Sequence, residues 1–163
     1  MVADPHHELI TDLIGTSLTI GDQIQFRVVS NSMAILINSG DSVLIEITQP
    51  DLIKRGDIVV VRRDGDFLTH RAICPANNGW FTKGDNTIRF DSPAKTSNII
   101  GRVVTIYKAD QSTLQTGEWF RLNLFLAKLS ELEARTFSFQ PLLSSPFRFC
   151  IKIVQKYMLW RNR

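Results

Sequence analysis

Three side chains that could together perform acyl transfer occur along the chain in the order serine, histidine, aspartate. Ser30 and Ser32 stand in "VVSNSMAILIN", His70 in "FLTHRAI" and Asp91 in "TIRFD". A serine hydroxyl becomes a nucleophile only when a neighbouring base takes its proton and a third group orients that base. The stretches of chain between Ser32 and His70, and between His70 and Asp91, are long enough for different strands to bring the three groups together.

The strand that carries His70 also permits a purely structural interpretation. Leu68, His70 and Ala72 share one face of "FLTHRAI", so the imidazole points with apolar neighbours. Most domains contain a serine, a histidine and an aspartate, and composition alone therefore favours a packed core histidine. His6 and His7 belong to no motif, and we expect them at the surface.

Short runs with strand character must position these groups. Apolar and polar residues alternate in "QIQFRVV", and an Asp64-Gly65 pair between two apolar runs predicts a tight hairpin turn. Gly101, inside the run expected to be the last strand, indicates a bulge or a tight bend. Strands are predicted within 23–29, 39–47, 54–74, 77–86 and 98–108. The sequence predicts a mainly β, α+β fold, a barrel or folded sheet ending near Lys108, with a short helix over 5–14 before it.

The composition changes near Thr116. Residues 1–116 carry 11 basic and 13 acidic side chains, net −2, whereas residues 117–163 carry 8 and 3, net +5. We therefore predict a β domain over 1–116 and a basic helical segment over 117–163. Helices are expected over 117–137 and 145–163, although the alternation in "FRFCIKIVQ" also permits a strand.

The second of these helices has two interpretations. Arg148, Lys152 and Lys156 form one basic stripe, and Trp160 belongs to a broad apolar face. The helix could pack on its own core, which we favour, or contact a membrane or a partner protein.

Composition excludes several other classes. The N-terminal stretch "MVADPHHELITDLIG" lacks the basic start and apolar run of a signal peptide, and no apolar stretch approaches the length needed to span a bilayer. Cys74 and Cys150 are interpreted as buried thiols in a reducing compartment, not as a disulfide or a metal site. We therefore expect a cytoplasmic protein without cofactor or metal. No nucleic-acid-binding motif is present.

Five boxes in order, "VVSNSMAILINSGDSVLIE", "IKRGDIVVVRR", "LTHRAI", "FTKGDNTIRFD" and "IIGRVVTI", resemble the type I signal peptidase superfamily. The resemblance covers 26–106 and is closer to the endoplasmic-reticulum and archaeal branch, which uses Ser-His-Asp, than to the bacterial Ser-Lys branch. It implies that Ser32 is the nucleophile, His70 the general base and Asp91 the residue that orients His70.

The resemblance also assigns supporting roles. Ser30 corresponds to a serine whose hydroxyl forms the oxyanion hole with the Ser32 N–H. Asp85 corresponds to a second site acid, although a turn former is the simpler interpretation, and Asn86 follows it in "KGDN". Met33 is expected to anchor the serine turn. Lys83 is expected at the surface, because it is not at the base position.

Three departures from the family pattern stand out. Ile35 replaces the usual proline, Asn31 stands where glycine is common, and Phe90 leaves Asp91 as the only acid at its site. None of these changes removes a reacting group. They leave open the alternative that the chain is a catalytically degenerate module of the same fold, which binds a peptide or a membrane. A LexA-like self-cleaving regulator is disfavoured, because the stretch before Ser32 is too short for a DNA-binding domain with a cleavage loop, the base would be lysine and no Ala-Gly pair occurs. We expect a peptidase for a leader, propeptide or signal-like segment, bound as an extended strand.

Overall fold

The computed structural model describes residues 19–109, 113–139 and 145–161. The helix predicted over 5–14, with His6 and His7, lies outside these residues. The strands are β1 (Gln23–Arg27), β2 (Ser42–Ile47), β3 (Ile58–Arg63), β4 (Asp66–Ala76), β5 (Gly79–Lys83), β6 (Ala94–Lys95), β7 (Ile99–Tyr107) and β8 (Thr113–Gln115). Short 3-10 helices follow β2, β6 and β8, namely η1 (Pro50–Leu52), η2 (Thr96–Asn98) and η3 (Thr116–Trp119).

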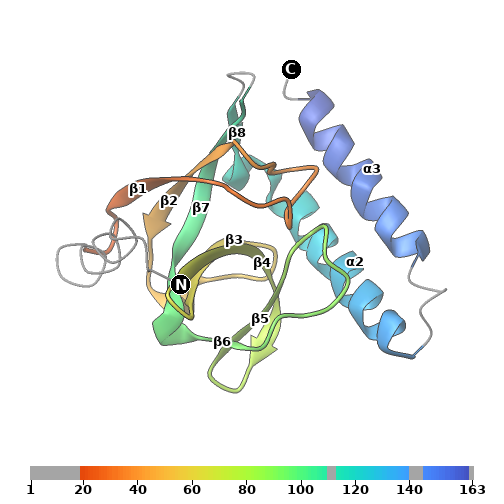
Figure 1. The fold of residues 1–163 in the computed structure, drawn as a ribbon, viewed down its shortest axis with the longest axis horizontal. Helices are drawn as coiled ribbons and strands as arrows, with labels where there is room; N and C mark the ends of the chain where they lie inside the picture. The colour runs from red at the N-terminus through yellow and green to blue at the C-terminus, as the bar shows by residue number, and fades with distance from the viewer. Residues whose placement is uncertain (1–18, 110–112, 140–144, 162–163) are drawn as a thin grey trace, which may run out of the picture.

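All strand pairs are antiparallel, in the order β1-β2-β7-β3-β4-β5-β6, with β8 added to β7. Figure 1 shows this sheet strongly folded. The predicted mainly β fold is confirmed, and of its two forms the folded sheet is correct, since the sheet does not close into a barrel. Strand β7 is not the last strand, because the short β8 returns along it; so short a strand leaves little periodicity to detect.

The β3–β4 hairpin confirms its predicted turn. Asp64 has φ 52° and Gly65 has φ 86°, the two positive values that a type I′ turn requires. Gly101 lies where the pairing of β3 with β7 shifts register. A Cβ atom at Gly101 would come within 2.2 Å of the Glu46 carbonyl oxygen, so only glycine fits between the neighbouring strands.

Strand β3 is buried on both faces, which explains its unbroken run "IVVV". Ile58 and Val60 belong to one core cluster, and Val59 and Val61 to another. The first cluster is the larger and reaches the C-terminal helices; it includes Met33, Trp119, Leu126, Ile151 and Met158.

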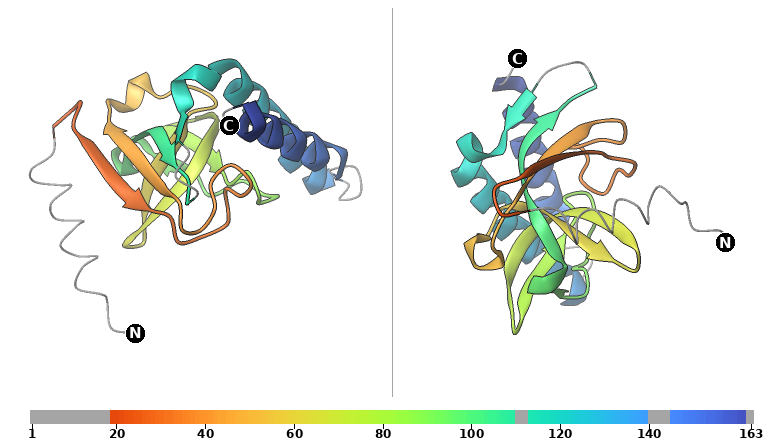
Figure 2. Two further views of the ribbon diagram at one scale, coloured as in Figure 1. Left: turned by 90° about the horizontal axis from the view of Figure 1, so that it is seen from above. Right: turned by 90° about the vertical axis from the view of Figure 1, so that its left-hand side faces the viewer.

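Two helices, α2 (Phe120–Phe139) and α3 (Ser145–Arg161), follow the sheet. They lie side by side in Figures 1 and 2 and contact each other, while α2 also packs on β4. Both predicted helices are present, and the strand alternative for "FRFCIKIVQ" is wrong. Within the described ranges, no helix is both long and apolar enough to cross a membrane.

Candidate active site

The structure brings Ser32, His70 and Asp91 together from three separate segments. His70 Nε2 lies 2.9 Å from Ser32 Oγ, and His70 Nδ1 lies 2.6 Å from Asp91 Oδ2. Ser32 belongs to the loop after β1, His70 to β4, and Asp91 to the segment between β5 and β6. Both distances are within hydrogen-bond range.

The surroundings of Asp91 determine which imidazole nitrogen carries the proton. Thr82 Oγ1 donates to Asp91 Oδ2 over 2.7 Å, and the Asp91 N–H donates to the Thr82 carbonyl oxygen over 2.9 Å. Since a carboxylate only accepts, the proton of neutral His70 belongs on Nδ1. Nε2 is then left as the acceptor for the Ser32 hydroxyl, which is the arrangement a general base needs.

A glycine permits the close approach to His70 of the serine loop, the segment 28–41 between β1 and β2 that carries Ser32. A Cβ atom at Gly84 would stand 2.6 Å from the Ser32 carbonyl oxygen and 2.9 Å from His70 Nε2. Asn86 holds the same loop, since its N–H donates to the Ser32 carbonyl oxygen over 2.7 Å and its Nδ2 to the Asn31 carbonyl oxygen over 3.2 Å. The "KGDN" box therefore forms one wall of the site.

Within the serine loop, Ser30 Oγ lies 3.3 Å from Ser32 Oγ. The Asn31 side chain points back into the loop, where its Oδ1 accepts the Ser39 N–H over 2.9 Å. This bond gives Asn31 a structural role that the sequence pattern left unexplained. Met33 is buried, as expected of an anchor, and its sulfur accepts the Asp85 N–H over 3.3 Å.

Asp85 lies beside the serine loop but pairs with Arg71. Arg71 Nε and Nη2 donate to its two carboxylate oxygens over 2.8 and 2.7 Å, and Gln155 Nε2 from α3 donates over 2.8 Å. Burial raises the pKa of Asp85, but the charge and hydrogen bonds of Arg71, with Lys83 nearby, outweigh burial and hold that pKa below its ordinary value. The carboxylate that contacts His70 is therefore that of Asp91.

Arg71 is fully buried, and each of its three side-chain nitrogens donates a hydrogen bond. Its Nη1 donates to the Gly56 carbonyl oxygen over 2.8 Å and to Asn123 Oδ1 of α2 over 2.9 Å. Replacement of one partner of such a pair leaves an uncompensated buried charge. The Arg71–Asp85 pair therefore ties β4 and the "KGDN" box to both C-terminal helices.

Lys83 is not at the surface, and this expectation was wrong. The side chain is fully buried, and its Nζ lies 2.8 Å from Glu133 Oε2 as a charge contact without hydrogen-bond alignment. Glu133 Oε1 in turn accepts Arg148 Nε of α3 over 2.8 Å. The cause is long-range, because α2 covers this end of β5 with a carboxylate that is far along the chain from Lys83.

Gln155 reaches the serine loop from α3. Besides donating to Asp85, it accepts the Ile35 N–H with its Oε1 over 3.4 Å. The sequence offered no signal for this role, because glutamine on a helix usually faces solvent. The role of Thr82 was also missed, although it stands in the "FTKGDN" box shortly before Gly84.

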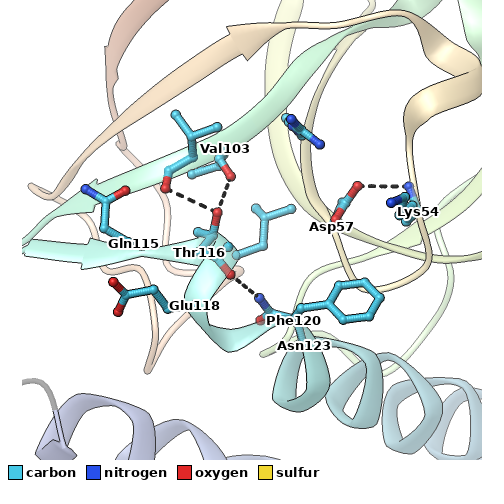
Figure 3. Close-up of a pocket in the computed structure, with 12 residues that line it drawn as sticks. Lys54, Asp57, Val103, Gln115, Thr116, Glu118, Phe120 and Asn123 are labelled. Carbon is cyan, nitrogen blue, oxygen red and sulfur yellow. Dashed lines mark hydrogen bonds between the residues drawn. The ribbon is translucent and has the colours of Figure 1, made fainter.

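Two cavities differ in their relation to the triad. One of about 590 Å³, shown in Figure 3, lies between β7 and the start of α2 and contains no triad residue. There the Thr116 hydroxyl donates to carbonyl oxygens of β7, and the Thr116 carbonyl oxygen accepts Asn123 Nδ2. The other, of about 70 Å³, is lined by Ser30, Ser32, Met33 and apolar residues of β1 and β4. The chemistry of the site belongs to the smaller cavity.

Neither cysteine forms a disulfide. Cys74 is half-buried and Cys150 is exposed, so the expectation of two buried thiols was wrong. In the part of the chain that the structure describes, no group of histidine, cysteine and carboxylate residues could hold a metal ion.

Comparison with known families gives the class of the protein. The model of the Peptidase S24-like family matches residues 10–104, a span that contains Ser32, His70 and Asp91. This is more than half of the 163 residues, and the chain belongs to the Peptidase S24-like family. The match supports the superfamily resemblance and indicates a peptidase of the serine type. No curated protein matches the chain in sequence.

Proposed function

We propose that the protein is a serine endopeptidase that cuts a leader, propeptide or signal-like segment through Ser32, His70 and Asp91. One observation carries the proposal: Ser32 Oγ lies 2.9 Å from His70 Nε2, and the opposite imidazole nitrogen is held 2.6 Å from Asp91. A histidine buried only for packing would not require a serine hydroxyl at one ring nitrogen and a carboxylate at the other.

The proposed reaction follows from these contacts. His70 Nε2 takes the Ser32 proton while Oγ attacks the substrate carbonyl carbon. The resulting oxyanion is stabilised by the Ser30 hydroxyl and the Ser32 N–H. On collapse the C–N bond breaks, and His70 gives its proton to the leaving amine. Water, activated by the same imidazole, then hydrolyses the acyl-Ser32 ester.

The pairing of β4 supports an extended substrate beside the site. Strand β5 pairs with β4 only from Arg71 onward, so over 68–70 strand β3 is the one partner of β4 among the described strands. Leu68 and Thr69 of this stretch line the small cavity. A peptide could add there as a strand, between this stretch and residues 28–30. The small size of this cavity, about 70 Å³, favours a small side chain next to the scissile bond.

The finer assignment follows the residue at the base position. A histidine, His70, stands where the bacterial branch carries lysine, and we therefore propose the Ser-His-Asp branch of the superfamily. The same observation disfavours the LexA-like alternative. A cytoplasmic location and the boundary between 1–116 and 117–163 stay predictions from the sequence.

The test uses two sets of synthetic peptides that differ only in the residue before the scissile bond, alanine in one and phenylalanine in the other. We expect the wild type to cleave the alanine set preferentially, and Ser32→Ala to abolish cleavage. Cleavage by Ser32→Ala at the wild-type rate would exclude Ser32 as the nucleophile. A degenerate binding module, which the replacement of the usual proline by Ile35 motivates, would bind the peptides without cleaving them.

A further inference from the structure

Helix α3 has an outer face of large apolar side chains. Phe149, Ile153, Tyr157 and Trp160 recur every three or four residues and are 67%, 50%, 44% and 73% exposed. Its opposite face is buried, with Ile151, Gln155 and Met158 in the interior. Packing on the core therefore accounts for only one face of this helix. Four such side chains on one stripe are more than isolated surface hydrophobics require.

Position in the fold leaves this outer face accessible. Figures 1 and 2 show α3 at the periphery of the molecule, alongside α2. The aromatic rings of Tyr157 and Trp160 lie together, with centroids 6.3 Å apart. Indole and phenol rings combine an apolar body with a polar tip, and such rings are enriched where membranes meet water.

The charged side chains that α3 carries next to this face are all basic. Lys152 and Lys156 are exposed next to the apolar stripe, and α3 contains no acidic residue. Elsewhere in the helical segment, Glu131 pairs with Arg55 and Arg135, and Glu133 pairs with Lys83 and Arg148. Glu131 and Glu133 are thus engaged away from Lys152 and Lys156. The third carboxylate of the segment, Glu118, lines a cavity with Tyr157 and Arg161 at the C-terminal end of α3.

We propose that the outer face of α3 docks in the plane of an anionic membrane surface. Phe149, Ile153 and Trp160 would enter the boundary between headgroups and acyl chains, while Lys152 and Lys156 contact lipid phosphates. A second copy of the chain fits this face less well. Symmetric pairing would bring the lysines of both copies together without an acidic residue from either helix.

The test measures binding to vesicles of phosphatidylcholine alone and of phosphatidylcholine with about one third phosphatidylglycerol, by flotation and by tryptophan emission. We expect binding to the anionic vesicles with a blue shift from Trp160, which Trp160→Phe removes. Each basic residue near an anionic surface contributes about fivefold in partitioning, so the double variant K152E/K156E should bind at least about 30-fold more weakly.

The matched control is K54E/K95E, which makes the same change in net charge at two exposed lysines of the β part. This control should lose only a small, nonspecific fraction of the binding. Phe149→Ser together with Ile153→Ser should weaken binding without unfolding the chain, which thermal unfolding checks, because both side chains already face solvent.

Two outcomes would overturn the proposal. One is equal binding by wild type and K152E/K156E, or no binding by either. The other is a dimer in light scattering that Trp160→Ser dissociates, with no vesicle binding, which would make this face an interface between copies. Ser32→Ala is assayed in parallel. It should bind vesicles like wild type, so failure of the proposed catalysis and failure of docking are separable.

Discussion

Gly84→Ala tests whether close contact between the "KGDN" box and the serine loop sets the catalytic geometry. The added Cβ would stand 2.6 Å from the Ser32 carbonyl oxygen and 2.9 Å from His70 Nε2. Ordinary van der Waals contact begins near 3.4 Å, so both atoms must withdraw by several tenths of an ångström, the carbonyl oxygen further than the imidazole. The Ser32 carbonyl oxygen is backbone that also accepts the Asn86 N–H, and it cannot move independently of the nucleophile.

The expected loss follows from this displacement. A withdrawal of this size would lengthen the 2.9 Å contact between Ser32 Oγ and His70 Nε2 beyond a normal hydrogen bond. Misplacement of reacting groups by about 1 Å costs about 100-fold in rate, which corresponds to about 2.7 kcal/mol of barrier. Overpacking should also lower the free energy of unfolding by about 1–3 kcal/mol, which leaves the chain folded.

The assay is acylation by a p-nitrophenyl ester, followed as nitrophenolate release, with circular dichroism as the check on folding. Gly117→Ala is the matched control, because a Cβ there meets nothing within 4 Å. We expect Gly117→Ala to acylate like wild type and Gly84→Ala about 100-fold more slowly. Wild-type acylation by a folded Gly84→Ala protein would refute the proposed role of this contact.

Three further predictions concern the oxyanion and the buried charges. Ser30→Ala should slow acylation by about 100-fold, because it removes one oxyanion donor. Asp85→Asn should lower the free energy of unfolding at pH 7 by about 3–5 kcal/mol, since Arg71 loses its charged partner, with urea unfolding as the measurement. The pKa of Asp85 is lower in the folded than in the unfolded chain. Its carboxylate therefore stabilises the fold above the unfolded pKa of about 3.9, and this stabilisation is lost as the pH falls through the folded pKa. In Asp85→Asn, the free energy of unfolding should depend less on pH in this acidic range. Glu133→Gln should cost about 3–5 kcal/mol in the same assay, because buried Lys83 loses its counter-charge.

Each of these three has a clear opposing result. Acylation of Ser30→Ala at the wild-type rate would show that the Ser30 hydroxyl does not stabilise the oxyanion. An Asp85→Asn protein whose unfolding has the same acid dependence as wild type would show that this carboxylate does not titrate as proposed. An unchanged urea midpoint for Glu133→Gln would mean that Lys83 is stabilised without it. Lys95→Gln, at an exposed lysine, is the control for surface charge.

Local patterns were sufficient for most of the sheet. Three features could be predicted from the sequence, because they depend on neighbouring residues or on the conformational freedom of glycine. They are the Asp64-Gly65 turn, the alternation in β1 and the bulge at Gly101. Strands β6 and β8 were missed because both are too short to show a period. Whether the sheet closes into a barrel depends on the pairing of its edge strands, which no local sequence pattern predicts.

The candidate site divides in the same way. The order and spacing of Ser32, His70 and Asp91 pointed to their meeting, and the structure brings them together. The supports from the helices were invisible, since Lys83 pairs with Glu133 and Asp85 with Gln155, across long stretches of chain. A buried lysine and a surface lysine look alike until the covering helix is placed.

The most direct test of the central claim is peptide mass spectrometry of the protein quenched during reaction with the p-nitrophenyl ester. We predict an acyl group on the peptide that contains Ser32, absent in Ser32→Ala and much slower to form in His70→Ala. An acyl group on another residue, or equal labelling in Ser32→Ala, would contradict the assignment of Ser32 as a nucleophile activated by His70.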